Sequence, residues 1–394
     1  MSNPLLERLQ PYPFERLRAL FAGISPNSGL SPVNLSIGEP KHPTPDVLKN
    51  ALKEHLDGLA VYPATLGLPE LRQAISGWIS RRYGIAASAE TQVLPALGSR
   101  EALFSFAQVV LDPAESDALV VSPNPFYQIY EGAALLGGAQ PHYLPLQSSG
   151  QCDYAAVPAA IWQKTRLVYV CTPGNPTGAV LSQQQWNVLF EASDRYGFVI
   201  AADECYSEIY LDENNPPLGA LQASVAAGRP DFRRLVVFSS LSKRSNAPGL
   251  RSGFVAGDEN LLKQFLKYRT YHGSAMSTTV QLASAAAWND DEHVRENRSQ
   301  YLSKFKAMLP LLQKRFEVGM PEAGFYLWLK VPGCDQRFCQ LALQQMNVTL
   351  LPGSFLARTV DGVNPGAGFV RIALVAPLQD CITAAERLVK IELN

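Results

Sequence analysis

The chain has 394 residues, of which 47% are hydrophobic and 18% charged, and its formal net charge is −1. This is a globular composition with room for two or three domains, and the charge balance argues against broad nucleic-acid binding. No apolar run approaches the roughly 18 residues of a membrane span, and the start of the chain lacks the apolar stretch of a signal peptide. Six scattered cysteines without a CxxC pair favour a reducing, cytoplasmic location.

Several kinds of chemistry lack their usual motifs. The sequence contains no HExxH, GxxxxGK[ST] or GxSxG, and its nearest approach to GxGxxG, at 366–371, ends in Arg371. None of the five histidines forms a ligand-like pair. We therefore expect neither a metal site nor the phosphate loop of a nucleotide-binding enzyme.

The predicted elements begin with a proline-rich, irregular arm of about 45 residues that contains one short helix near 14–21. From residue 46, short apolar runs alternate with helical patterns. Helices are predicted between Pro69 and Gly84, over 99–111, and over 182–196, where Ser182 and Gln185 have capping-box spacing. The predicted strands, several of them unbroken apolar runs of the kind covered on both faces, are 93–97, 118–121, 167–171, 198–202, 235–239 and 254–256.

This strand–helix repetition predicts an α/β fold, with a three-layer α/β/α large domain and a mostly parallel sheet over residues 46–280. After Thr279 the pattern changes. A helical stretch of roughly 278–316 precedes strand-like runs at 324–331 and 369–374. We expect residues 281–394, with the N-terminal arm of residues 1–45, to form a smaller α+β domain.

The most informative segment follows the predicted strand 235–239 and contains Lys243 among hydroxyl side chains. Such a lysine can be a solvated surface residue. It can also form a Schiff base with a carbonyl cofactor, for which it must lose its proton, and the cationic neighbourhood of this segment promotes that loss. Ser240 and Ser242 offer hydroxyls to an anion, and pyridoxal phosphate presents a phosphate beside an imine.

Other candidate residues follow the neighbouring predicted strands. Asp203 could hold a pyridinium nitrogen, while Tyr206 and Asn175 could reach the phenolic oxygen of the same ring. Ser99 begins a helix, where free N–H groups attract anions, and Tyr127 offers a flat ring. Each could also be a cap, a turn or a core residue, but all of them lie at strand ends, where open α/β sheets bind ligands.

Taken together, the chain resembles the fold-type I, class I and II aminotransferases that depend on pyridoxal phosphate, over essentially its whole length. The resemblance implies pyridoxal phosphate as cofactor, small-molecule amino and keto acids as substrates, and a homodimer. The motifs that carry it are Gly38-Glu39-Pro40, Tyr62-Pro63, Gly67, Gly98-Ser99, Tyr127, PGNPTG at 173–178, Asp203 with Tyr206, Ser240-Leu241-Ser242-Lys243 with Arg251, and Phe369-Val370-Arg371.

Carried over residue by residue, the resemblance implies that Lys243 carries the Schiff base and moves the proton. It implies that Asp203 pairs with the pyridine nitrogen, that Asn175 and Tyr206 contact the phenolic oxygen, and that Tyr127 stacks on the ring. The implied phosphate ligands are Ser99, Arg100, Ser240, Ser242 and Arg251.

On the substrate side, the resemblance implies that Arg371 binds the α-carboxylate as a planar, bidentate partner, with Gly38 close to it. Tyr62 is expected to reach the phosphate bound by the neighbouring subunit. The stretch 242–258, with 268–273, resembles the succinyldiaminopimelate aminotransferases of bacterial lysine biosynthesis. Their substrate has further carboxylates, for which the candidate cations are Arg244, Arg269 and Lys41.

The resemblance thus implies transfer between glutamate and N-succinyl-2-amino-6-oxopimelate. Aspartate, aromatic or acetylornithine-type specificity remains open, because distal-pocket residues decide it. A Cβ–S lyase would use the same lysine. A non-catalytic ligand sensor of a transcription regulator would need a basic DNA-binding domain, for which the residues before 46 leave no room.

Overall fold

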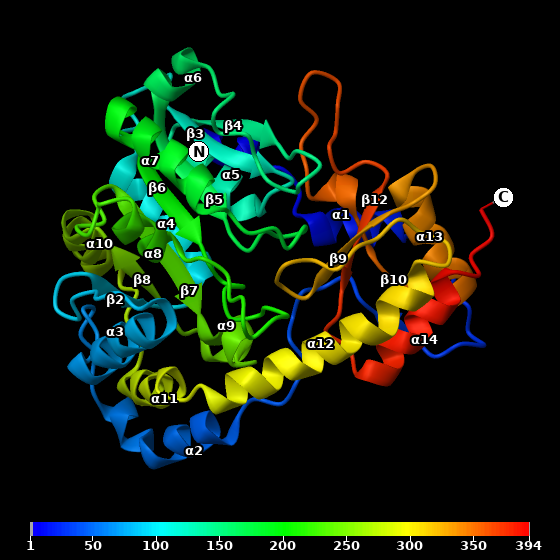
Figure 1. Ribbon diagram of the computed structural model, residues 1–394, viewed down its shortest axis with the longest axis horizontal. Coiled ribbons are helices and arrows are strands. Elements are labelled where there is room, and N and C mark those ends of the chain that lie inside the picture. Colours follow the sequence, from blue (N-terminus) through cyan, green and yellow to red (C-terminus); the bar gives the residue numbers. More distant parts are fainter. Residues whose placement is uncertain (1–2, 394) are drawn as a thin grey trace.

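The computed structural model describes residues 3–393. Its larger part is built on one seven-stranded sheet (Figure 1). In spatial order its strands are β2 (Val93–Ala96), β8 (Gly253–Gly257), β7 (Leu235–Ser240), β6 (Val199–Asp203), β5 (Thr165–Cys171), β3 (Leu119–Asn124) and β4 (Gln140–Pro145). β8 runs antiparallel to both neighbours and the pairings from β7 to β4 are parallel, so the prediction of a mostly parallel sheet is confirmed.

Side-chain alternation along the central strands divides the core into two apolar clusters, one on each face of the sheet. On β5, Val168 and Val170 belong to one cluster, while Leu167 and Tyr169 belong to the other. The first face is covered by α3 (Pro69–Tyr83), α7 (Gln183–Tyr196), α8 (Ala220–Ala226) and α11 (Thr278–Trp288), and the second by α4 (Ser99–Val110), α5 (Gln128–Leu136) and α10 (Glu259–His272). The predicted three-layer architecture is therefore confirmed.

Local signals explain where helices of this part begin and end. The Ser182 hydroxyl accepts a hydrogen bond from the Gln185 N–H at 3.3 Å, and the Gln185 side chain accepts one from the Ser182 N–H, as the capping-box spacing predicted. Gly197, with φ +81°, ends α7. The shorter elements are α2 (Asp46–Glu54), η2 (Leu56–Ala60), α6 (Ala159–Lys164), α9 (Leu241–Arg244) and η3 (Pro248–Leu250).

The smaller part contains an antiparallel sheet of β11 (Leu351–Pro352), β12 (Phe369–Ala373) and β9 (Tyr326–Lys330), in that order. The N-terminal arm reaches this part, since β1 (Val33–Asn34) pairs with β10 (Val348–Thr349). In Figure 1 the long helix α12 (Glu292–Leu312) runs from beside the larger part into the smaller one. The remaining elements are η1 (Pro4–Arg8), α1 (Pro13–Leu20), α13 (Asp335–Met346), η4 (Gly353–Phe355) and α14 (Leu378–Leu388).

Two features differ from the prediction. The helical stretch 278–316 is two helices, α11 and α12. Asp290, the residue before the N-cap Asp291, satisfies the start of the second: its Oδ1 accepts from the N–H groups of Glu292 and His293 at 2.9 and 3.2 Å. The strand β4 was not predicted. Its sequence contains two prolines and few apolar residues, and such a strand is tolerated at the sheet edge, where β4 lies.

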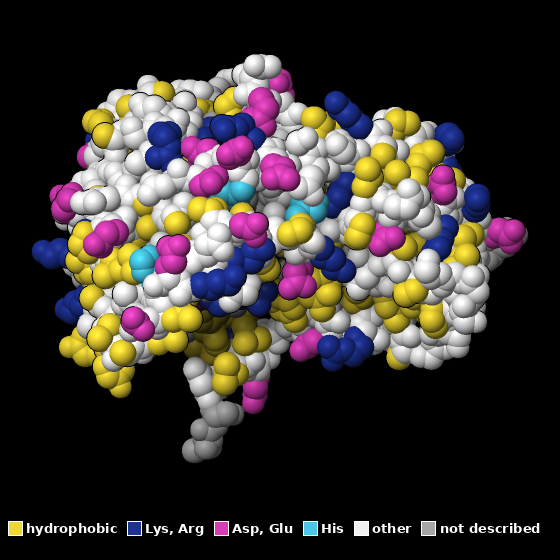
Figure 2. All heavy atoms as spheres, turned by 90° about the horizontal axis from the view of Figure 1, so that it is seen from below, with side chains coloured by type: hydrophobic (Ala, Val, Ile, Leu, Met, Phe, Trp, Pro, Cys, Tyr) yellow, Lys and Arg dark blue, Asp and Glu magenta, His cyan; other side chains and the backbone are white. Residues whose placement is uncertain are grey.

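The surface carries both charge signs. In Figure 2, seen from below, Lys and Arg side chains are interspersed with Asp and Glu, and hydrophobic side chains gather along the lower left edge of the view. Within residues 3–393, no helix combines the length and apolar character needed to span a membrane.

Candidate active site

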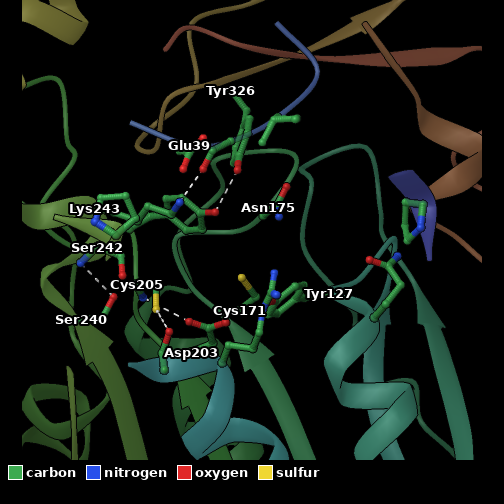
Figure 3. Close-up of a pocket in the computed structure, with 18 of the residues that line it drawn as sticks. Glu39, Tyr127, Cys171, Asn175, Asp203, Cys205, Ser240, Ser242, Lys243 and Tyr326 are labelled. Atoms are coloured by element: carbon green, nitrogen blue, oxygen red, sulfur yellow. Dashed lines mark hydrogen bonds between the residues drawn. The ribbon is translucent and has the colours of Figure 1, made fainter. Parts of the chain in front are cut away.

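A cavity of about 600 Å³ lies where the larger part, the smaller part and the N-terminal arm meet. Its lining comes from the ends of β6 and β7, from loops after β2, β3 and β5, and from β9, β12 and the arm (Figure 3). Tyr62 lies outside the lining and is fully exposed after η2. The predicted cofactor ligands other than Tyr62, and the two residues predicted at the α-carboxylate, all line this cavity: Gly38, Ser99, Arg100, Tyr127, Asn175, Asp203, Tyr206, Ser240, Ser242, Lys243, Arg251 and Arg371.

Lys243 enters the cavity from α9, the short helix that follows β7 (Figure 3). The Ser240 hydroxyl accepts from the Ser242 N–H at 3.3 Å and caps this helix. The Lys243 amine donates to the backbone carbonyl of Gly38. Burial lowers the pKa of the Lys243 amine to about 8, and the positive charge of Arg371 acts in the same direction. A larger fraction of this amine is therefore neutral at physiological pH than of an ordinary lysine.

Asp203 ends β6 and is buried on the floor of the cavity. Its Oδ2 accepts from the Tyr130 hydroxyl at 2.7 Å, and its Oδ1 accepts from the Cys205 N–H at 3.2 Å. Burial raises the pKa of Asp203, and these two donors oppose the rise because they stabilise the carboxylate. The carboxylate is thus held in one orientation and would gain stability from a cationic partner.

Hydroxyl and guanidinium groups gather at the start of α4. Ser99 is the first residue of this helix, whose first N–H groups have no partner within the helix. Ser240, Ser242 and Arg251 line the same cavity. Gly98 has φ +79°, a conformation that favours glycine, and a Cβ there would stand 2.6 Å from Nη2 of Arg251. Donors of this kind at a helix N-terminus suit a phosphate.

At the other end, Arg371 reaches the cavity from β12 and is buried. Its Nη2 donates to the Ser36 carbonyl at 2.8 Å, and its Nη1 donates to Asn175 Oδ1 at 3.1 Å. Its Nε has no hydrogen-bond partner among the described residues. A buried guanidinium with an unused donor is suited to a carboxylate ligand.

Gly38 sits where no side chain fits. A Cβ there would be 1.9 Å from the hydroxyl oxygen of Tyr326, which lies 2.9 Å from the Tyr206 hydroxyl oxygen. The missing side chain lets the Gly38 turn approach Tyr326 and brings its carbonyl to Lys243.

The Arg100 side chain makes its contacts with tyrosines. Its Nε donates to the Tyr127 hydroxyl at 2.6 Å, and its Nη2 lies 3.5 Å from the Tyr12 hydroxyl. Burial raises the pKa of Tyr127, so this phenol stays protonated at physiological pH. The exposed guanidinium of Arg100 retains donors for a ligand.

The expectation that Arg244 or Arg269 faces the distal end of a substrate is wrong. Both side chains are fully buried outside the cavity lining. Arg244 donates to Asp291 at 2.9 Å, and Arg269 donates to Glu101 at 2.7 Å. Lys41 is exposed and also outside the lining. The helical pattern around these residues did not reveal which side faces the cavity.

Several lining residues were not predicted: Tyr12, Glu39, Cys205 and Tyr326. Glu39 and Cys205 adjoin predicted site residues in the sequence, and this adjacency could have drawn attention to them. Tyr12 and Tyr326 come from segments whose approach to the sheet depends on the tertiary fold, so no local signal identifies them.

Pyridoxal phosphate fits this set of residues. The cluster at the start of α4 offers hydroxyl, N–H and guanidinium donors to a phosphate, with Gly98 leaving space for Arg251. The buried, oriented Asp203 carboxylate suits a protonated ring nitrogen, and Lys243 supplies an amine with a lowered pKa. When bound, this cofactor supplies a ring that accepts electrons from the substrate.

Comparisons with known proteins agree with this fit. The sequence profile of the family "Aminotransferase class I and II" matches residues 31–388. An LL-diaminopimelate aminotransferase from Nitratidesulfovibrio vulgaris (strain DSM 19637 / Miyazaki F) is 31% identical over 97% of each chain.

Solved structures give the same result. The crystal structure of an aminotransferase from Neisseria meningitidis Z2491 is 54% identical, with a TM-score of 0.95 over 98% of this chain and 99% of that one. A probable N-succinyldiaminopimelate aminotransferase from Thermus thermophilus is 26% identical, with a TM-score of 0.84 over 96% and 99%. The chain therefore belongs to the class I and II aminotransferase family and is an aminotransferase that depends on pyridoxal phosphate.

Proposed function

We propose that the chain transfers an amino group between glutamate and N-succinyl-2-amino-6-oxopimelate, the succinyldiaminopimelate transaminase reaction of lysine biosynthesis. The observation that carries this proposal is the position of Arg100, an exposed cation in the cavity lining. Lys243, Arg251 and Arg371 are the other cations of the cavity lining, and the cofactor and the α-carboxylate occupy them. The exposed Arg100 guanidinium contacts Tyr127 and Tyr12 but retains N–H donors for the distal carboxylates of this substrate, which has no distal ammonium.

The chemistry assigned to the chain's own residues follows from their environments. Lys243 holds the cofactor through its amine, and once released it moves the proton at the substrate Cα, for which a pKa near neutrality is suited. Asp203 keeps the ring nitrogen protonated, while Asn175 and Tyr206 contact the phenolic oxygen and Tyr127 stacks on the ring. The phosphate ligands are Ser99, Ser240, Ser242 and Arg251, together with the backbone of Arg100.

The substrate α-carboxylate binds Arg371, beside Gly38. Arg371 is already oriented by Ser36 and Asn175, so little side-chain freedom is lost when a carboxylate binds. Because donor and acceptor acids both carry an α-carboxylate, both use this guanidinium. The smaller part and the arm, which contribute Arg371 and Tyr12, cover the substrate and exclude water.

A second candidate substrate is LL-diaminopimelate itself, which relatives such as the Nitratidesulfovibrio protein are named for. Its distal end carries an ammonium as well as a carboxylate. Glu39, exposed in the cavity lining, could pair with that ammonium while Arg100 binds the carboxylate. The succinylated substrate offers no cation to Glu39.

A donor panel with 2-oxoglutarate as acceptor distinguishes the two candidates. We expect kcat/KM for N-succinyl-LL-diaminopimelate to exceed that for LL-diaminopimelate, aspartate, acetylornithine and aromatic amino acids. Arg100→Gln should raise KM for the preferred donor roughly 10-fold or more, the loss of one charge-assisted hydrogen bond. Preference for LL-diaminopimelate, with a KM that Glu39→Gln raises selectively, would replace the proposed substrate by the second candidate.

The proposal includes a homodimer in which Tyr62 reaches the neighbouring subunit's phosphate. Tyr62 is fully exposed, and Leu56, Leu59 and Val61 expose apolar side chains beside it. Mixing Tyr62→Phe and Lys243→Ala subunits tests this. A mixed dimer regains one site with both native residues, so cofactor affinity at that site should recover. Absence of recovery in a confirmed mixed dimer would exclude this role of Tyr62.

A further inference from the structure

A buried chain of polar side chains connects β12 with the helix that carries Lys243. Lys304 of α12 lies with its Nζ 2.6 Å from His42 Nε2 and donates to the carbonyl of Leu374, just after β12, at 3.1 Å. His42 Nδ1 lies 2.7 Å from Asn297 Oδ1. Asn297 Nδ2 points to the carbonyl of Lys243 at 3.4 Å. Lys304 and Asn297 are both buried.

These contacts specify the protonation state of His42. An ammonium group only donates, so Nε2 must accept from Lys304 and Nδ1 must carry the proton. Nδ1 then donates to Asn297 Oδ1, which leaves the Asn297 amide N–H groups for the Lys243 carbonyl. The imidazole is therefore neutral and its tautomer is fixed. Burial lowers the pKa of His42, and the charge of Lys304 acts in the same direction.

The location of His42 links this chain to the active site. The preceding residues Ile37, Gly38 and Glu39 line the cavity. The Gly38 carbonyl accepts from Lys243, and the Ser36 carbonyl accepts from Arg371. These acceptors are backbone atoms, so their positions depend on where the segment is anchored.

We propose that His42 is a positioning residue for transamination: held between Lys304 and Asn297, it anchors residues 36–39 against Lys243 and Arg371. The proposal rests on the functions proposed above for those two residues. Loss of the anchor should weaken substrate binding more than it slows the chemical step. Lys243 remains attached to α9 and β7, whereas the substrate-facing turn loses its support.

Protonation of His42 would break the same anchor. Both nitrogens of an imidazolium carry protons, so neither can accept the Lys304 hydrogen bond. The charged ring and the Lys304 ammonium would also lie 2.6 Å apart. The titratable and charged groups facing His42 are Lys304 and Tyr301 of α12, with Cys381 of α14 beside Lys304. None of these offers a negative charge at neutral pH. KM should therefore rise once the pH falls below the lowered pKa of His42.

The test compares His42→Phe, His42→Gln and the control His142→Phe in the holoenzyme. Phenylalanine keeps a ring against Tyr301, whose centroid lies 4.5 Å from that of His42, but makes no hydrogen bond. We expect KM to rise about 5- to 30-fold for both amino donor and keto acceptor, with kcat changed less than about threefold. His142 is a half-buried histidine on β4, and its replacement should change neither constant.

Glutamine can accept from Lys304 but cannot titrate. His42→Gln should therefore recover much of the affinity and lose the rise in KM at acidic pH that wild type shows. An unchanged KM in His42→Phe overturns the proposal. If that variant fails to fold, identical acidic KM profiles for wild type and His42→Gln overturn it. Lys243→Ala and Arg371→Lys test the proposed function separately. If Lys243→Ala abolishes activity and Arg371→Lys weakens it, but the His42 variants leave KM unchanged, the positioning role of His42 is refuted and the proposed function is not.

Discussion

Replacement of Arg371 by lysine measures how much a planar guanidinium contributes to binding the α-carboxylate. Arg371 directs Nη1 to Asn175 and Nη2 to Ser36, and its Nε is unpaired among the described residues. A lysine keeps the charge but cannot hold both neighbours and donate to a carboxylate in the same plane. Losing one charge-assisted hydrogen bond costs about 1.5–3 kcal/mol, which corresponds to roughly a 10- to 150-fold fall in kcat/KM.

The assay is steady-state kinetics with glutamate as amino donor and, separately, with the keto acid as acceptor. Because both acids use the same guanidinium, kcat/KM should fall by similar factors for both. Arg166→Lys is the matched control, since Arg166 pairs with Glu115 at 2.7 Å and lies outside the cavity lining. An unchanged constant for either acid, with thermal stability preserved, would refute the assignment of the α-carboxylate to Arg371.

Three further predictions concern the cofactor end and the Gly38 turn. The rate of cofactor uptake by apoenzyme should rise with pH through about 8, because burial lowers the pKa of Lys243 and only the neutral amine attacks an aldehyde. Stopped-flow absorbance measures this rate. A pH–rate profile with its midpoint above 10 would contradict the prediction. Asp203→Asn should weaken cofactor binding roughly 100-fold or more in a spectroscopic titration, since a buried charge pair loses one partner. The control Asp194→Asn, whose carboxylate pairs with Arg229, Arg233 and Arg234 outside the cavity lining, should bind the cofactor normally. Gly38→Ala should lower the free energy of unfolding by about 1–3 kcal/mol and raise KM, because the alanine Cβ would overlap the Tyr326 hydroxyl. If neither effect appears, the turn can move away from Tyr326.

Local sequence signals identified most of the secondary structure, because apolar runs and caps act over a few residues. The strand predicted at 93–97 is β2, Val93–Ala96, and the one predicted at 235–239 is β7, Leu235–Ser240. The break at Asp290 was not predicted, since one side chain there takes over two backbone donors that a continuous helix would have paired. β4 was not predicted because it depends on pairing with β3 rather than on its own residues.

Some residues of the candidate site could be predicted from the sequence and others could not. Residues at the ends of strands, such as Asp203 and Lys243, could be proposed from position alone, because parallel strands bring their carboxyl ends to one edge. The orientation of Arg244 and Arg269 could not, because each is a cation on a helix whose buried side depends on tertiary packing. The sequence provides the charge, and only the fold shows that Asp291 and Glu101 neutralise it.

The contacts that join the two ends of the site explain a further limit. Arg371 and Lys243 both donate to main-chain carbonyls of the segment 36–38, and Lys304 donates to the carbonyl of Leu374. Every residue has a backbone carbonyl, so the residue types at positions 36 and 374 do not reveal that their carbonyls are hydrogen-bond acceptors in the site. What the sequence must preserve instead is the path of the backbone, which here requires a missing side chain at Gly38 and an anchor at His42. Substitutions at Ser36 that keep this path should therefore be tolerated. Changes at Gly38 and His42 should shift the carbonyl that orients Arg371 and so weaken its binding of the α-carboxylate.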